Sequence, residues 1–267
     1  MSNDARSPLE ISKVLDAVVE KKSRESVGEM IFLGMLAGIY IGFGAVAATT
    51  VSAFGGMPVG LAKLLAASVF CVGLILVVIP GSELFTGNIL MATGLVGGKV
   101  GFGRVVRNWF FVYLGNFVGS ILLALAMSGS GLLGSPEEVT AVGANAAKIA
   151  DAKIALAFAP ALLRGVLCNM LVCLAVILAI AARSVEGKIL GIYFPIMVFV
   201  LAGFEHSIAN MYFLPAGLLA KGEFMTRFFE MFRNLIPVTL GNIIGGLVVI
   251  LLHPARTRRL SGAFRRG

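Results

Sequence analysis

The sequence predicts an all-α membrane protein with six transmembrane segments, arranged as an inverted 3+3 repeat in which the second and fifth segments are broken. Three observations predict this architecture: the composition, six long apolar runs, and a repeat between the two halves. Of the 267 residues, 58% are hydrophobic and 13% are charged. A soluble domain carries about 25% charged residues, so the composition excludes an ordinary soluble globule.

Each run is long enough to cross a bilayer, since a helix needs about 20 apolar residues to do so. The runs cover residues 30–51, 61–96, 109–127, 154–182, 189–219 and 235–252. The second is interrupted at Pro80–Glu83 and the fifth at Gly203–His206. Non-helical backbone is tolerated at membrane depth only where protein or a water-filled cavity satisfies it. We therefore expect the helical hydrogen bonding to stop near 80–87 and 202–208, at a permeation site.

The two halves of the chain repeat each other. Seven positions of the third run recur in the sixth at an offset of 126, among them Gly115-Asn116 and Gly241-Asn242. The interruptions match at an offset of 122, each containing Gly-x-Glu followed by an asparagine. With three segments per half, the second copy must enter the membrane from the opposite side, which predicts an inverted repeat.

The charges suggest how the chain is divided and oriented. Residues 1–28 have apolar positions at helical spacing, which predicts an amphipathic cytoplasmic segment on the membrane surface or on the protein's own mouth. We expect a channel domain over 29–255, with repeats 29–128 and 154–255, and a basic cytoplasmic tail over 256–267. Lys and Arg gather at both ends and in the loops after the second and fourth segments. Both termini are therefore expected in the cytoplasm, and the net charge of +8 reflects this rather than nucleic acid.

Two carboxylates lie inside the interruptions. Glu83 and Glu205 are costly in a membrane and are candidates for function. Each would either face the pore or tie down its own loop by accepting loop hydrogen bonds, and we favour loop anchoring. Asn116 and Asn242 are expected to form hydrogen bonds between helices.

Three further polar residues are candidates for the permeation path. His206 follows Glu205 at the second interruption, where it would line the pore and give a hydrogen bond or a proton to a small anion; the alternative is a satisfied buried histidine. Asn169 has no partner in the repeat and is a pore candidate. Lys153, at the expected start of the fourth segment, is either a surface charge or attracts anions into a vestibule. No nucleotide loop, metal-ligand spacing or nucleophilic triad occurs in the sequence, so no cofactor, metal or catalytic residue is expected.

Five motifs, taken together and in order, resemble the formate/nitrite transporter family. They are Glu83–Asn88, Leu114–Asn116, Cys168–Ala175, Gly203–Met211 and Ile236–Gly246. The resemblance implies an aquaporin-like fold in the cell membrane and a homopentamer with one pore per protomer. It also implies passage of small monovalent anions, namely formate, nitrite or hydrosulfide, with the involvement of protons.

The resemblance also implies roles for individual residues. Leu74, Leu84 and Phe85 match a cytoplasmic constriction, and Val172 and Phe199 match an outer one. Thr86, Asn169 and His206 match the polar groups of a central chamber, and Lys153 matches a basic residue near the outer vestibule. Apolar rings around a neutral polar centre would exclude hydrated ions, because a desolvated anion has a large transfer cost and its neutral acid a small one.

Three other functions are open at this point. An aquaporin-type channel would carry Asn-Pro-Ala at both interruptions, and neither contains it. A proton-coupled secondary transporter of the same anions is separable from a channel only by transport assays. A membrane enzyme would require a nucleophile–base pair or a metal cluster, for which the sequence offers no motif.

Overall fold

The computed structural model describes residues 5–252, and these residues form helices without any β-strand. The helices are α1 (Pro8–Ser23), α2 (Val27–Ala53), α3 (Val59–Phe70), α4 (Val72–Val78), α5 (Phe85–Asn88), η1 (Ile89–Met91), α6 (Ala92–Val96), α7 (Phe102–Gly129), α8 (Ala141–Ile154), α9 (Phe158–Ala181), α10 (Val185–Leu201), α11 (Ser207–Ala220), α12 (Phe224–Arg227), η2 (Phe228–Met231) and α13 (Phe232–Leu252). The expected tail, 256–267, lies outside the described residues.

The helices agree with the predicted membrane segments. Five stretches of the described chain are long and apolar enough to cross a membrane, at α2, α3–α4, α7, α9 and α12–α13. The fifth predicted segment consists of α10, with 17 residues, followed by the short helix α11. Many large apolar side chains on the outside of the bundle are exposed, including Phe32, Phe110 and Leu163, as expected of a surface that meets lipid or another subunit.

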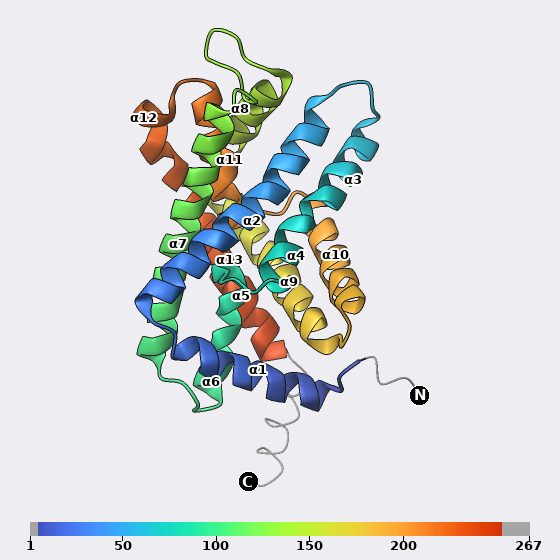
Figure 1. Cartoon of the computed structure of the whole chain (residues 1–267), viewed down its shortest axis with the longest axis vertical. Helices are drawn as coiled ribbons and strands as arrows, with labels where there is room; N and C mark the ends of the chain where they lie inside the picture. Colours follow the sequence, from blue (N-terminus) through green and yellow to red (C-terminus); the bar gives the residue numbers. More distant parts are fainter. Residues whose placement is uncertain (1–4, 253–267) are drawn as a thin grey trace.

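The two halves run in opposite directions. In Figure 1, α2 and α7 rise from the end of the molecule at which α1 lies, whereas α9 and α13 descend toward that end. The short helices that follow the two breaks occupy opposite ends, with α6 near α1 and α11 near α8 (Figure 1). This is the arrangement that an inverted repeat requires.

Both predicted interruptions are present, in slightly shorter form than expected. The first covers residues 79–84 and the second 202–206, because Phe85 and Ser207 already begin new helices. Gly81 (φ +89°) and Gly203 (φ +74°) turn the chain at equivalent points. Only glycine adopts such φ values without steric cost, which explains why both interruptions contain it.

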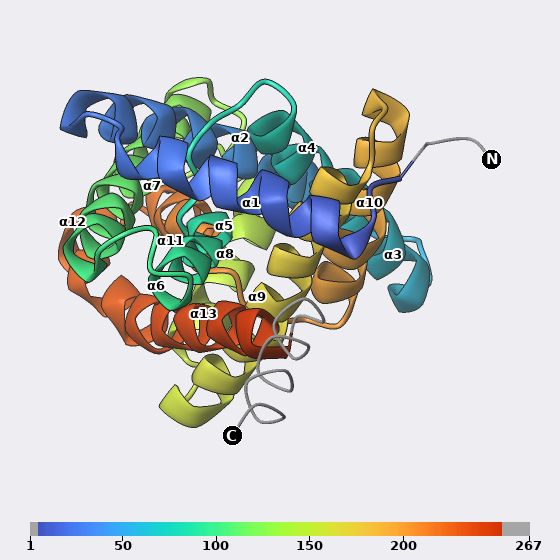
Figure 2. The ribbon, with the colours of Figure 1, turned by 90° about the horizontal axis from the view of Figure 1, so that it is seen from below.

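The N-terminal helix lies on the protein itself. Ser7 and Glu10 form a capping box that starts α1, and its buried face consists of Ile11, Leu15 and Val19. These side chains pack in a cluster with residues of α6, α7 and α9. Figure 2 shows α1 crossing the end of the bundle beside α5 and α6, so of the two expected positions α1 takes the protein's own mouth.

Helix α8 was not predicted. The expected fourth segment, 154–182, is divided by a bend at residues 155–157 into the end of α8 and all of α9. The buried face of α8 includes Ala146, Ala150 and Ile154 at helical spacing, and the helix packs mainly on α11. Its Asp151 forms ion pairs with Lys221 and Arg227, which follow α11. Helix α8 thus packs with the second half of the chain although it begins before residue 154, the expected start of the second repeat.

Glycines allow the long helices of each half to approach closely. Helix α2 packs on α7 and helix α9 on α13, each pair crossing at glycines. A methyl carbon placed on Gly119 would lie 2.8 Å from the carbonyl carbon of Met35 and closer still to its oxygen. Since backbone cannot move aside as a flexible side chain does, these glycines fix the distance between the helices.

We expect Gly119→Ala to destabilise the protein by about 1–3 kcal/mol, because the added methyl group would separate α2 from α7. Thermal unfolding of the purified protein in detergent measures the effect. Gly103→Ala is the matched control, since it lies in the same helix with nothing within 4 Å of the added carbon. Equal unfolding temperatures for the two variants would contradict the assignment of Gly119 as a close-packing residue.

Candidate functional site

The two breaks meet at a hydrogen bond between Thr86 and His206. Thr86 Oγ1 and His206 Nε2 are 2.9 Å apart, and both residues are buried. His206 is also the N-cap of α11, where its Nδ1 accepts the backbone N–H of Ala209 at 3.1 Å. An acceptor Nδ1 carries no proton, so the proton of the neutral ring is on Nε2 and is donated to Thr86.

This arrangement leaves a free donor at the centre. Because Thr86 Oγ1 accepts from the imidazole, its own O–H points elsewhere, and the structure records no second partner for it within residues 5–252. The helices that begin at Phe85 and Ser207 direct their N-terminal ends toward the same region. Helix N-termini are electropositive, so the centre suits an anion or a hydrogen-bond acceptor.

Asn169 joins this cluster from α9. Its Nδ2 donates to the backbone oxygens of Thr86 at 3.2 Å and Asn242 at 2.6 Å. Its Oδ1 is buried without a partner among the residues that the structure describes. The structure therefore brings together the three polar residues that were expected in the central chamber.

The loops are anchored by asparagines rather than by the glutamates. Asn116 accepts the N–H of Phe85 and donates to the carbonyls of Gly34 and Glu83 at 2.8–3.0 Å. In the second half, an equivalent set of bonds at 2.8–3.0 Å surrounds Asn242, with Ser207, Gly165 and Glu205 as the partners. Each asparagine thus satisfies backbone groups on both sides of a break and also joins it to a neighbouring helix. The expectation that these asparagines join helices was correct but left out their hydrogen bonds to the backbone of the breaks.

The carboxylates instead form ion pairs. Glu83 pairs with Lys22 of α1 and accepts Nδ2 of Asn88. Glu205 pairs with Lys153, with both oxygens at 2.9–3.0 Å from Nζ, and accepts Nδ2 of Asn210. The donors to both carboxylates are side-chain ammonium and amide groups, not loop N–H groups, because the asparagine anchors already occupy the loop backbone. The expectation of direct loop anchoring by Glu83 and Glu205 was therefore wrong.

Lys153 differs from its expected position. It lies in the last turn of α8, not at the start of the fourth membrane helix, and its charge is neutralised by Glu205. Its side chain is 15% exposed. A free attractive charge at this site is thus ruled out in this conformation.

Sequence reasoning also missed Lys22, the counterpart of Lys153. Both lysines end an amphipathic helix that covers one end of the bundle, α1 or α8. Each then pairs with the acid of the nearest break. The signal in the sequence was the spacing of buried residues: both α1 and α8 have apolar residues four positions apart, as an amphipathic helix does.

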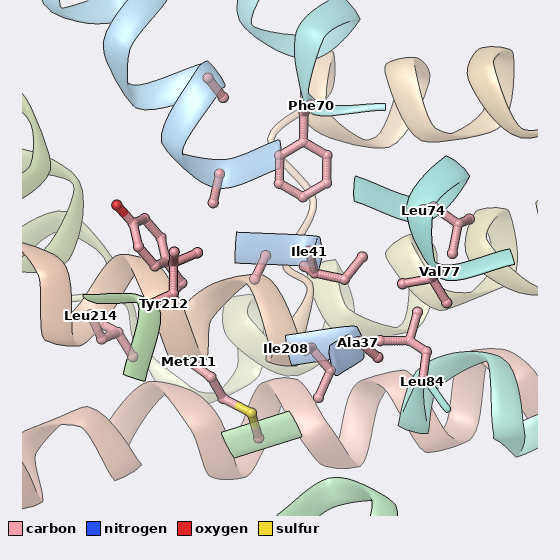
Figure 3. Close-up of a cluster of buried hydrophobic side chains, with 14 of the residues drawn as sticks. Ala37, Ile41, Phe70, Leu74, Val77, Leu84, Ile208, Met211, Tyr212 and Leu214 are labelled. Carbon is pink, nitrogen blue, oxygen red and sulfur yellow. The ribbon is translucent and has the colours of Figure 1, made fainter. Parts of the chain in front are cut away.

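Two cavities lie on the path on either side of a pair of leucines. The larger, about 380 Å³, extends beneath α1 to the first break, and the smaller, about 10 Å³, lies against His206. Leu74 and Leu84 line both cavities and therefore lie between them. The close-up in Figure 3 shows Leu74 and Leu84 beside Ile41 and Phe70.

The small cavity is almost wholly apolar. Val172 and Phe199, expected at a separate outer constriction, line the same cavity as Leu74 and Leu84. Phe70, Ile41 and Ile196, which the sequence did not single out, also line it. The ring of Phe199 stacks on His206 with centroids 5.9 Å apart and meets Phe70 edge-on at 5.7 Å. The cavity has room for about one water molecule at most, since a water needs about 10–15 Å³ of such space. Side chains must therefore move before an ion can pass.

Phe85 does not take its expected place. It lines neither cavity, and its ring packs edge-on against Tyr113 at 4.8 Å and Trp109 at 6.3 Å. Phe85 begins α5, so its side chain is directed to α7, while Leu84 in extended backbone faces the path. Of the three residues expected at the cytoplasmic constriction, Leu74 and Leu84 line the cavities and Phe85 does not.

Comparison with known proteins gives one consistent answer. The formate/nitrite transporter family profile matches residues 9–255. The probable formate transporter of Methanothermobacter thermautotrophicus is 43% identical over 94% of this chain and 96% of its own length. Formate channel FocA of Escherichia coli K12 is 36% identical over 92% of each chain.

Solved structures agree with the sequence relatives. A pentameric formate channel with formate bound superimposes with a TM-score of 0.71 at 38% identity, covering 84% of this chain and 94% of that one. An ion channel of the same family gives a TM-score of 0.81 at 28% identity over 94% and 99% of the two chains. Both the motifs and the fold therefore agree with a multi-pass membrane transport protein. The chain belongs to the formate/nitrite transporter family.

Proposed function

We propose that the protein is a membrane channel for small monovalent anions or their weak acids, with formate as the main substrate and nitrite or hydrosulfide as further ones. The observation that carries the proposal is the Thr86–His206 hydrogen bond at the junction of the breaks. It leaves the Thr86 hydroxyl free to donate beside His206, which lines the small and otherwise apolar cavity. Relatives named for formate transport support the choice of formate.

The chemistry of the path favours a neutralised anion. A bare formate ion would lose most of its hydration between Leu84 and Phe199, which costs several kcal/mol or more. The Thr86 hydroxyl and the electropositive helix ends offset part of this cost. Uptake of a proton removes most of the rest, so the substrate crosses the apolar parts of the path as its weak acid.

The same comparisons support the assembly that we propose, and the charges support the orientation. We place both termini and α1 in the cytoplasm, in agreement with the distribution of Lys and Arg. A homopentamer with one pore per protomer is the proposed assembly, supported by the similar pentameric formate channel and by the exposed apolar outer faces. On this basis residues 29–255 form the channel.

Formate flux into liposomes that contain the purified protein tests the function. We expect rapid passage of formate and slower passage of nitrite and hydrosulfide, because formate is the substrate named for the relatives. Stopped-flow light scattering measures this, with protein-free liposomes as the control. Saturation of the flux at low formate concentration, with stimulation by formate on the opposite side of the membrane, would instead indicate a proton-coupled transporter, and flux of glycerol alone would indicate a neutral-solute channel.

The constriction predicts a change in flux on truncation of Leu84. We expect Leu84→Ala to raise formate flux at least about twofold, because removing a buried leucine side chain opens the path between the cavities. Leu122→Ala is the control, since Leu122 is 46% exposed on the outside of the bundle. Lower flux in Leu84→Ala with normal folding would contradict the constriction.

The role of His206 is tested by two replacements. His206→Asn retains a side-chain N-cap acceptor for α11 and an N–H donor but has no titrating proton, whereas His206→Phe has neither donor nor cap. We expect Phe to cost about 0.5–2 kcal/mol of stability through the lost cap and to reduce flux. The pH dependence of formate flux then decides the mechanism. If hydrogen bonding by residue 206 matters, the pH profile of His206→Asn resembles that of the wild type. If proton transfer matters, it resembles that of His206→Phe. Identical flux and pH profiles in all three proteins would refute a role for His206.

A further inference from the structure

Glu25 lies at the inner cavity and takes no part in the site described above. It belongs to the short connection between α1 and α2 and lines the 380 Å³ cavity together with Lys22 and Glu83. Its Oε2 is buried and has no hydrogen-bond partner within the described part of the chain. Its backbone oxygen accepts a hydrogen bond from Arg107 of α7, which holds the residue in place.

The groups around Glu25 favour its protonated form. Burial is the main effect and raises the pKa of Glu25 to about 7, and the neighbouring Glu83 and Glu29 act in the same direction. Lys22 and Lys21 act in the opposite direction, but Lys22 is already paired with Glu83. With such a pKa, Glu25 changes from mainly protonated to mainly ionised as the pH rises through about 7.

The charge of the cavity depends on this proton. Its charged lining residues are Lys21, Lys22, Glu25 and Glu83. Their charges cancel when Glu25 is ionised and leave one positive charge when it is protonated. A cleft with low-dielectric walls concentrates ions of opposite charge, so anions gather in the cavity when Glu25 binds a proton.

We propose that Glu25 is a proton-binding residue of the anion path whose protonation sets the charge of the inner cavity and thereby the rate of anion passage. This inference rests on the proposed function and adds to it a residue that makes the path sensitive to pH at the inner mouth. No movement of α1 is required, because the charge changes while the cavity walls stay in place.

Glu25→Gln separates this effect from other sources of pH dependence. Formate flux is measured in liposomes at equal inner and outer pH, and the ratio of variant to wild-type flux is compared between pH 6 and pH 8. We expect this ratio to rise about threefold or more, since only the wild type loses the positive charge as the pH rises. Glu25→Ser also removes the charge, so we expect the same rise in the flux ratio. This variant replaces Glu25→Gln in the experiment if the glutamine variant does not fold.

Glu186→Gln is the matched control, because Glu186 is an exposed carboxylate at the start of α10, outside both cavities. Its flux ratio is expected to stay constant with pH. An infrared titration of wild type against Glu25→Gln supplies a readout independent of transport and should show one carboxyl group losing its proton near neutral pH. A constant flux ratio in both Glu25 variants, or no such carboxyl group, overturns this inference alone. Absence of formate flux in the wild type overturns the proposed function and this inference with it.

Discussion

The structure depends on the satisfaction of backbone groups at two breaks inside the membrane. A helix that stops at membrane depth exposes N–H and C=O groups that lipid cannot bind, at several kcal/mol each. One asparagine per half meets this demand, Asn116 at the first break and Asn242 at the second, each by three hydrogen bonds to backbone groups. Because the breaks are held in this way, Thr86 and His206 can meet, and the electropositive helix ends can face the same centre.

Most of the fold could be predicted from sequence because hydrophobic length and glycine position are local signals. Gly81 and Gly203 marked the breaks to within a few residues, and the repeat of three segments indicated opposite directions for the halves. Helix α8 was missed because its polar residues, such as Asn145 and Asp151, hide its apolar spacing. Its last residue, Ile154, also continues into the apolar run of α9. The bend itself, residues 155–157, contains no proline or glycine, and the nearest signal of a new helix is Pro160 in the first turn of α9.

The sequence predicted which residues form the site better than it predicted their contacts. Thr86, Asn169 and His206 meet as expected, because motif position determined their place at the breaks. Phe85 was expected at the constriction but lies against α7. The backbone changes from extended at Leu84 to helical at Phe85, so these two neighbouring side chains point in different directions. The partners of Glu83 and Glu205 depend on long-range contacts to lysines 61 and 52 residues away, which a local motif does not show.

The two lysine–glutamate pairs have a consequence for biosynthesis. In each half the lysine precedes its glutamate in the chain, Lys22 before Glu83 and Lys153 before Glu205. The ribosome therefore makes the cation, together with the amphipathic helix that carries it, before the acid that must enter the membrane. An isolated carboxylate in the bilayer is costly, and this order provides the counter-ion in advance for both halves, although the halves run in opposite directions.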